Sequence, residues 1–275
     1  MAGDDAAPSL ETYHGNCHCG AFRYSVKLDH LKEVAYCNCS FCSKKGLLWA
    51  FLASVDDFVV EKGEGTLKSY SFGKKTLVNE FCPNCGTPVM GQKHGEKPSI
   101  AINARTLQDF DPEPLKINVY DGAGLKPAYE PPNIPDPSNV DTSKEMYKGS
   151  CHCGKVTFNL QSEPINDLKV VDCNCNICSR NGVLWLYPPD DAVEVQGEQN
   201  MRYYSRYHKS EPTLGYGFCT TCGVLVLNTS KLPDNEPHIL PINVRAINGL
   251  NLDELKIEKL DGKTSFGEPY VLDAE

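Results

Sequence analysis

The chain has 275 residues, 40% of them hydrophobic, and a formal net charge of −9. Its length allows one large domain or two of about 100–150 residues each. Lysine and arginine are scattered and outnumbered by acidic residues, so a nucleic-acid partner is not expected, because such binding rests on cations that displace counterions from phosphates. No apolar run approaches the roughly 18 residues of a membrane-spanning helix, so no membrane partner is expected either.

The first ten residues are acidic and rich in small side chains. They lack the basic stretch and apolar core of a secretory signal peptide, so we expect a cytoplasmic protein. The chain carries 14 cysteines. In a reducing compartment, cysteines with orderly spacing favour metal binding over disulfide bonds.

Seven cysteines lie in the first half of the chain. In chain order, their clusters are Cys17-His18-Cys19, Cys37-Asn38-Cys39-Ser40-Phe41-Cys42 and Cys82-Pro83-Asn84-Cys85. Apolar and polar residues alternate over 21–26, which predicts a half-buried strand, and further short strands are expected over 58–60 and 99–103. A short helical turn is expected after the three-cysteine cluster.

The second half repeats this pattern. Its clusters are Cys151-His152-Cys153, Cys173-Asn174-Cys175-Asn176-Ile177-Cys178 and Cys219-Thr220-Thr221-Cys222. A strand is predicted over 155–160. Other elements also recur in matching places, namely Trp49 and Trp185, Asn103-Ala104-Arg105 and Asn243-Val244-Arg245, and Asp121-Gly122 and Asp261-Gly262. The repeating unit is therefore a whole domain rather than a solenoid unit.

The predicted fold class is mainly β, with short helical turns, in two tandem zinc domains. The first domain is expected over residues 1–125 and the second over 146–275. Five prolines and few apolar residues occur in the segment Lys126–Asp141. Residues 126–145 are therefore predicted to form a proline-rich, partly extended linker.

Seven cysteines per copy divide into four plus three. A structural zinc ion takes four protein ligands, whereas a catalytic zinc ion keeps three and an open position. The economical assignment places closed sites at Cys17, Cys19, Cys82 and Cys85 and at Cys151, Cys153, Cys219 and Cys222. It places open, catalytic sites at Cys37, Cys39 and Cys42 and at Cys173, Cys175 and Cys178. Either CxxC pair could complete a three-cysteine cluster instead. The economical assignment uses all 14 cysteines and predicts two Zn²⁺ per domain and four per chain.

Lys44 and Arg180 occupy matching places two residues after the last open-site cysteine. Each could bind a substrate carboxylate or offset the anionic zinc site, or be a solvated loop cation. Trp49 and Trp185 could wall a substrate pocket or belong to the core.

His18 and His152 sit between closed-site cysteines. The CxC turn directs the middle side chain away from the metal, so we expect both to be exposed. Arg105 and Arg245 could reach an anionic ligand, but a structural salt bridge on a strand is favoured.

The ordered motifs G-x-C-H-C-G, C-N-C-x-x-C-x-[KR]-x-G and F-C-x-x-C-G resemble those of the glutathione-dependent formaldehyde-activating enzyme family, also called the CENP-V/GFA domain. The resemblance spans nearly all of both halves, including the Asn-x-Arg and Asp-Gly elements. It implies an Mss4-like β-tent fold and the same four-plus-three division of zinc ligands. It also implies chemistry on glutathione adducts and carbon–sulfur bonds. The tandem pair departs from the usual single-domain form, which leaves open whether both open sites work.

A zinc site with three thiolates is soft and favours a sulfur atom as its fourth ligand, and the thiolate is the nucleophilic form of a thiol. We therefore predict a zinc-dependent carbon–sulfur lyase or adduct-forming enzyme, whose partner is a small glutathione-like thiol or thiol adduct. The alternative is a non-catalytic, zinc-stabilised binding or scaffold protein. A fourth ligand such as His94 or His208 at each three-cysteine site would favour that alternative.

Overall fold

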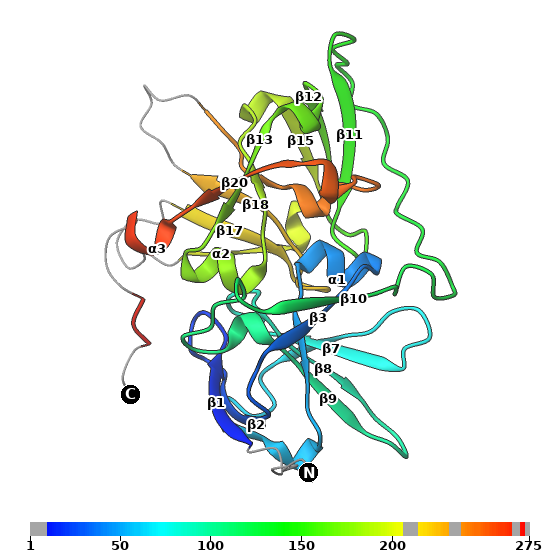
Figure 1. The fold of residues 1–275 in the computed structure, drawn as a ribbon. Helices are drawn as coiled ribbons and strands as arrows, with labels where there is room; N and C mark the ends of the chain where they lie inside the picture. The colour runs from blue at the N-terminus through cyan, green and yellow to red at the C-terminus, as the bar shows by residue number, and fades with distance from the viewer. Residues whose placement is uncertain (1–9, 206–213, 231–237, 266–269, 273–275) are drawn as a thin grey trace, which may run out of the picture.

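The protein is described here by a computed structural model, which covers residues 10–205, 214–230, 238–265 and 270–272. Its first half forms two β-sheets (Figure 1). The smaller sheet is antiparallel and has the order β1 (Glu11–Asn16), β2 (Arg23–Leu28), β5 (Phe58–Lys62).

The larger sheet of the first half has seven strands in the order β10-β3-β4-β9-β8-β7-β6. Its pairs are antiparallel except for β10 and β3, which run parallel. The strands are β3 (Glu33–Cys37), β4 (Trp49–Phe51), β6 (Lys68–Tyr70), β7 (Leu77–Phe81), β8 (Pro88–Lys93), β9 (Ser99–Asn103) and β10 (Lys116–Tyr120).

The second half repeats both sheets with the same connectivity. The three-stranded sheet contains β11 (Glu145–Ser150), β12 (Thr157–Ser162) and β15 (Val193–Gln196). The seven-stranded sheet has the order β20-β13-β14-β19-β18-β17-β16. Its strands are β13 (Lys169–Cys173), β14 (Trp185–Leu186), β16 (Met201–Tyr204), β17 (Leu214–Cys219), β18 (Leu225–Ser230), β19 (Ile242–Asn243) and β20 (Lys256–Leu260). The predicted mainly β class, with two tandem β domains, is confirmed.

Helices are short in the described part of the chain. The α-helices are α1 (Ser40–Lys45), α2 (Asn176–Asn181) and α3 (Gly262–Ser265). The 3₁₀ turns are η1 (Val55–Asp57), η2 (Ala104–Thr106), η3 (Ile165–Asp167), η4 (Asp190–Ala192), η5 (Glu198–Asn200), η6 (Val244–Ala246) and η7 (Leu252–Glu254). None of these helices is long and apolar enough to cross a bilayer.

The helical turn expected after each three-cysteine cluster begins inside the cluster instead. Cys39 is the extended residue that caps the start of α1, and Cys42 lies within the helix. Gly46 ends α1 in a left-handed conformation, and Gly182 ends α2 in the same way. Glycine adopts this conformation without the steric cost that a Cβ brings. The cluster thus bends from strand into helix around its three sulfurs.

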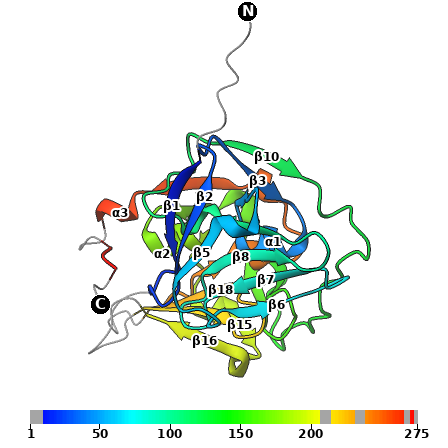
Figure 2. The same ribbon diagram turned by 90° about the horizontal axis from the view of Figure 1, so that it is seen from below.

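The predicted strand over 99–103 matches β9, but the one predicted over 21–26 begins two residues late, at Arg23. Phe22 belongs to the turn that closes around the first cysteines, because its N–H lies 3.3 Å from Cys17 Sγ and its carbonyl accepts from Cys17 N–H. Beyond the turn, Tyr24, Val26 and Leu28 are buried on one face of β2, as the alternation predicts. Figure 2 shows β1, β2 and β5 side by side.

The two domains meet through their helices. In Figure 1 the first domain fills the lower part of the molecule and the second the upper part, with α1 and α2 near the boundary. Helix α1 packs on η6 of the second domain, and α2 packs on η2 of the first. The helices that carry the three-cysteine clusters therefore also form the domain interface.

Between β10 and β11 the chain has no helix or strand. This segment still packs on the second domain, since Ile134 is buried and the Tyr129 hydroxyl donates to the carbonyl oxygen of His152 at 3.0 Å. The segment after the second domain makes the corresponding contact with the first domain, since the Tyr270 hydroxyl donates to the carbonyl oxygen of His18 at 2.6 Å. Each domain is thus partly covered by the segment that follows the other domain in the sequence.

Candidate metal centres

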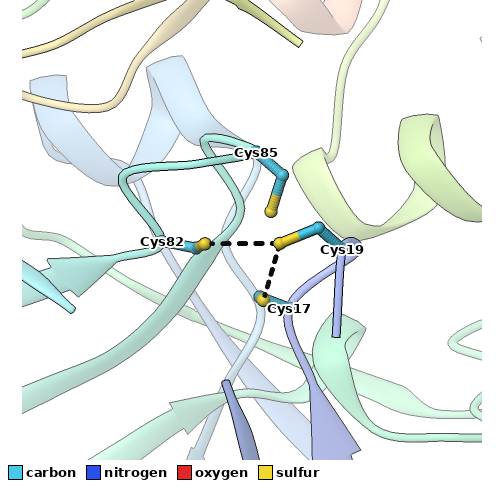
Figure 3. A group of neighbouring side chains, drawn as sticks. All are labelled: Cys17, Cys19, Cys82 and Cys85. Carbon is cyan, nitrogen blue, oxygen red and sulfur yellow. Dashed lines mark hydrogen bonds between the residues drawn. The ribbon is translucent and has the colours of Figure 1, made fainter. Parts of the chain in front are cut away.

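Four sulfur atoms of the first domain converge on one point (Figure 3). Cys17 and Cys19 follow β1, and Cys82 and Cys85 follow β7, so the group joins the two sheets. All four Sγ atoms lie within 4.8 Å of one another. The Cys17–Cys19 and Cys19–Cys82 sulfur pairs are 3.6 and 3.7 Å apart.

These separations fit a tetrahedral zinc ion. With Zn–S bonds of about 2.3 Å, the sulfurs at the corners of a tetrahedron are about 3.8 Å apart. The second domain has the same geometry, with 3.6 Å between the sulfurs of Cys151 and Cys153 and between those of Cys153 and Cys219, and Cys222 completes the group. Each four-cysteine group can therefore hold a metal ion in a closed site.

The thiols of each closed group also perturb one another. Hydrogen bonds from Cys17 and Cys82 hold the pKa of the Cys19 thiol well below its usual range, and Cys151 and Cys153 do the same for Cys219. Backbone N–H groups also approach the sulfurs, and Val156 N–H lies 3.3 Å from Cys151 Sγ. A cation is the natural partner of thiolates formed in this way.

The remaining three cysteines of each domain form a separate group. Cys37, Cys39 and Cys42 bring their sulfurs within 4.8 Å of one another, and so do Cys173, Cys175 and Cys178. No histidine, cysteine or carboxylate from the described ranges joins either group as a fourth member. The sulfurs are thus grouped four and three, as the economical assignment expects.

Of the two histidines considered as fourth ligands, the structure describes only His94. His94 is exposed in the turn between β8 and β9 and belongs to neither group. His208 lies outside the described residues.

Each three-cysteine group contains one acidic thiol. Hydrogen bonds from the neighbouring thiols of Cys37 and Cys42 lower the pKa of Cys39 to about 3, and Cys173 and Cys178 lower that of Cys175 to about 3. Deprotonated sulfur is the form that binds a metal.

Each tryptophan belongs to the core and also touches a three-cysteine group. Trp49 and Trp185 are only 7% and 2% exposed, yet their indole N–H groups point at cluster sulfurs. Trp49 Nε1 lies 3.4 Å from Cys42 Sγ, and Trp185 Nε1 lies 3.3 Å from Cys178 Sγ. An N–H donor stabilises negative charge on the sulfur it faces.

The repeated Asp-Gly element closes over each three-cysteine group. Asn38, between two of the cysteines, donates to Asp121 Oδ1 at 3.0 Å and accepts from the N–H of Ala123 at 2.8 Å. A Cβ on Gly122 would collide with Cys37 Sγ and lie 2.9 Å from Cys39 Cβ. Asn174 and Asp261 form the same bond at 2.8 Å in the second domain. The sequence repeats this element but does not reveal its contact with the sulfurs, which only the fold brings about.

Two segments of the chain, residues 12–120 and 146–255, match the family of the glutathione-dependent formaldehyde-activating enzyme. The chain belongs to this family. It contains two GFA copies, and together the matched segments cover most of the sequence. Among solved structures, a Rhodobacter sphaeroides protein determined as a structural genomics target is similar to this chain, with 29% identity over 39% of this chain and 99% of that one and a TM-score of 0.36.

The interpretation of Lys44 as a solvated loop cation is wrong. Lys44 is 5% exposed, because the second GFA copy covers it. Its ammonium group donates to the carbonyl oxygens of Ser150 and Ala246 at 3.1 and 2.9 Å and to Asn248 Oδ1 at 2.9 Å. All three acceptors belong to the second copy, so Lys44 ties the two copies together.

Arg180, the counterpart of Lys44, is also buried rather than solvated, at 6% exposure. Its Nε donates to the carbonyl oxygen of Asn16 in the first copy at 3.4 Å, and its Nη1 to Asn176 Oδ1 at 3.1 Å. The guanidinium lies 4.9 Å from the centre of the Tyr270 ring. Substrate binding by Lys44 and Arg180 stays a prediction.

The expectation that His18 and His152 are exposed is wrong, since they are 2% and 4% exposed. The opposite GFA copy covers each one. His152 lies 2.8 Å from the Tyr70 hydroxyl through Nδ1 and 3.0 Å from Ser40 Oγ through Nε2, while His18 Nδ1 lies 2.9 Å from the Tyr204 hydroxyl. The local turn does direct these rings away from the sulfurs, but into an interface.

The salt bridges favoured for Arg105 and Arg245 are absent from the described part of the chain. Both residues lie on 3₁₀ turns rather than strands. Arg105 Nε donates to the carbonyl oxygen of Gly46 at 2.8 Å, and Arg245 Nε donates to that of Gly182 at 2.7 Å. Each arginine therefore binds the backbone at the end of its own copy's α-helix.

Proposed function

We propose that the protein is a zinc-dependent enzyme that forms or cleaves carbon–sulfur bonds in glutathione-like thiol adducts. One observation carries the proposal: among the described residues, each domain has one group of four sulfurs and a second group of three. A zinc ion held by three protein ligands keeps a position for a substrate atom. On this proposal each domain binds two Zn²⁺ and the chain binds four.

The donor set favours sulfur chemistry over hydrolysis. Zinc bound by three thiolates would hold a substrate sulfur as its nucleophilic thiolate. Adduct formation would join the thiol sulfur to a carbonyl carbon and would transfer the thiol proton to the carbonyl oxygen. The reverse reaction breaks the carbon–sulfur bond and regenerates the carbonyl group. The family's description names both a thiol, glutathione, and a carbonyl compound, formaldehyde.

The chain's own residues support this site in two ways. The indole N–H of Trp49 or Trp185 places partial positive charge beside one ligand sulfur, which moderates the anionic charge of three thiolates. The bond between Asn38 and Asp121, or Asn174 and Asp261, holds the cysteine loop against the Asp-Gly turn. The ligands are thereby fixed before a substrate arrives.

Cobalt substitution tests the proposal. Glutathione should change the visible spectrum of the Co²⁺-loaded protein, because a further sulfur ligand adds charge transfer, whereas S-methylglutathione should not, because it has no thiol to ionise. If no thiol at millimolar concentration alters the spectrum, the enzyme proposal fails and the zinc-stabilised scaffold replaces it.

We also propose that the protein is cytoplasmic and acts on small molecules rather than nucleic acid, in keeping with its acidic composition.

A further inference from the structure

A cavity of about 360 Å³ lies between the two domains, and both contribute equally to its walls. The first domain supplies residues at and beyond η2, including Arg105 and Asp109, and the second supplies α2 with Arg180, Lys263 beyond β20, and Tyr270. Pockets for small molecules begin at about 300 Å³, so this space suits a small metabolite rather than a protein segment.

The cavity walls carry more positive than negative charge. Among the described residues of the lining, Arg105, Arg180 and Lys263 are cationic and Asp109 is the one acidic residue. Within the described ranges, no carboxylate forms an ion pair with either arginine. A buried cation without an ionic partner is costly, and a bound anion removes that cost.

Part of this charge is balanced within the protein. Burial lowers the pKa of Arg180, but Tyr270, Tyr24 and the sulfurs of Cys17 and Cys85 oppose this effect by favouring its charged form. Burial and then the like-charged Arg245 lower the pKa of Arg105, and Asp172 opposes this effect only in part. Lys263 is exposed and forms no ion pair in the described part of the chain. Arg105 is therefore the wall cation that gains most from a bound anion, whereas Lys263 is solvated and adds positive charge at the rim.

Both arginines are held in place before any ligand binds. Arg105 is fixed by the carbonyl oxygens of Gly46 and Ser179, at 2.8 and 3.4 Å. Arg180 is fixed by Asn176 and by the ring of Tyr270. Donors fixed in this way lose little conformational freedom on binding, which favours affinity.

The carboxylate of Asp109 makes the described part of the lining complementary to a zwitterion. Asp109 is an exposed residue with a positive φ of 52°, a conformation that aspartate tolerates better than most residues. Cations beside one carboxylate match the carboxylate and ammonium groups of an α-amino acid. We propose that this cavity binds the α-amino-acid head group of a small ligand, with its carboxylate toward Arg105, Arg180 and Lys263 and its ammonium toward Asp109.

The matching region of the other half is built differently. Lys44 replaces Arg180, and its ammonium already has three protein acceptors. Ala123 stands in the place of Lys263. We therefore expect one such head-group site per chain, although the chain has two three-cysteine groups. Binding in the cavity would therefore saturate at one equivalent per chain, whereas thiol binding at both three-cysteine groups would saturate at two.

Calorimetry on the zinc-loaded full chain tests the inference. The probes are glutamate, which is a free amino acid, and S-methylglutathione, which carries the same head group on a peptide but no thiol. Glutarate, which lacks the ammonium group, is the comparison ligand. We expect one equivalent of glutamate or S-methylglutathione per chain and at least fivefold weaker binding of glutarate. Stronger binding of glutamate identifies a free amino acid as the ligand, and stronger binding of S-methylglutathione identifies a peptide end.

Two exposed residues provide variants that spare the domain interface. Lys263→Ala should weaken probe binding at least fivefold, whereas Lys256→Ala, an exposed lysine on β20 outside the cavity, should not. Asp109→Asn should remove the preference for glutamate over glutarate, a change that a purely structural role would not produce.

Two equivalents per chain, unchanged affinity in Lys263→Ala and Asp109→Asn, or no binding of any probe at 10 mM would each overturn the inference. Because S-methylglutathione has no thiol, these results are independent of the cobalt experiment. Either proposal can fail while the other stands.

Discussion

Gly46 and Gly182 meet backbone to backbone where the two GFA copies touch. A Cβ on Gly182 would lie 2.7 Å from the carbonyl oxygen of Gly46, and a Cβ on Gly46 would collide with the carbonyl oxygen of Gly182. Both residues have a left-handed backbone, with φ of 55° and 58°. The helices can approach this closely only because neither residue has a side chain.

Substitution of Gly182 by alanine should therefore destabilise the protein by about 2–4 kcal/mol, combining the cost of a left-handed alanine with that of overpacking. Gly65→Ala is the matched control, because Gly65 also has a positive φ, of 70°, but no atom lies within 4 Å of its added Cβ. It should cost only about 1–2 kcal/mol. Urea unfolding measures both values, and equal costs would contradict the close contact.

Lys44→Met should destabilise the protein without weakening thiol binding. It keeps much of the apolar stem but leaves Asn248 Oδ1 and two carbonyl oxygens without their donor. Each unsatisfied buried acceptor costs about 1–3 kcal/mol. Lys144→Met, at an exposed position before β11, is the control and should have little effect. If Lys44→Met instead keeps full stability and loses the cobalt response to glutathione, Lys44 binds substrate rather than the second copy.

Zinc analysis should give close to four ions per chain, and cysteine variants should lose them with unequal consequences. Cys82→Ser breaks a closed site that joins the turn after β1 to the turn after β7, so its loss should unfold the first domain. Cys39→Ser affects a group confined to residues 37–42, where the metal closes only a short loop, so it should cost much less stability. Elemental analysis and thermal unfolding of both variants test this, and two zinc ions in the wild type would rule out metal at the three-cysteine groups.

Trp185→Phe should alter the electronic structure of the second three-cysteine site. It removes the N–H group that lies 3.3 Å from Cys178 Sγ while keeping an aromatic ring in the core. The sulfur then holds its electrons less tightly, so sulfur-to-Co²⁺ charge transfer should move to lower energy. Tyr203→Phe, on the exposed face of β16, should leave the band unchanged. An unshifted band in Trp185→Phe would show that the indole does not bond the ligand sulfur.

Features that depend on local residue spacing could be predicted from the sequence, whereas features that depend on packing between the two copies could not. Cysteine spacing suggests a four-plus-three division, because CxC and CxxC turns are local, but it leaves open which group each CxxC pair joins, and only the fold decides this. The period of two predicts the buried face of β2. By contrast, Lys44, His18 and His152 follow no local pattern that distinguishes a solvated loop from a loop covered by another domain. Their burial arises from packing between segments far apart in the chain.

Tyr129 and Tyr270 make equivalent contacts. Each lies in the segment that follows its own copy in the sequence, and each donates to the carbonyl oxygen of a histidine in the other copy. A surface that contacts its own equivalent in this way is isologous, the arrangement found in symmetric dimers. The chain therefore has the architecture of a homodimer whose subunits have been fused into one polypeptide. Fusion keeps the partners together at any protein concentration. It also allows each copy to change by itself, as Lys45 opposite Asn181 and Phe51 opposite Tyr187 already indicate.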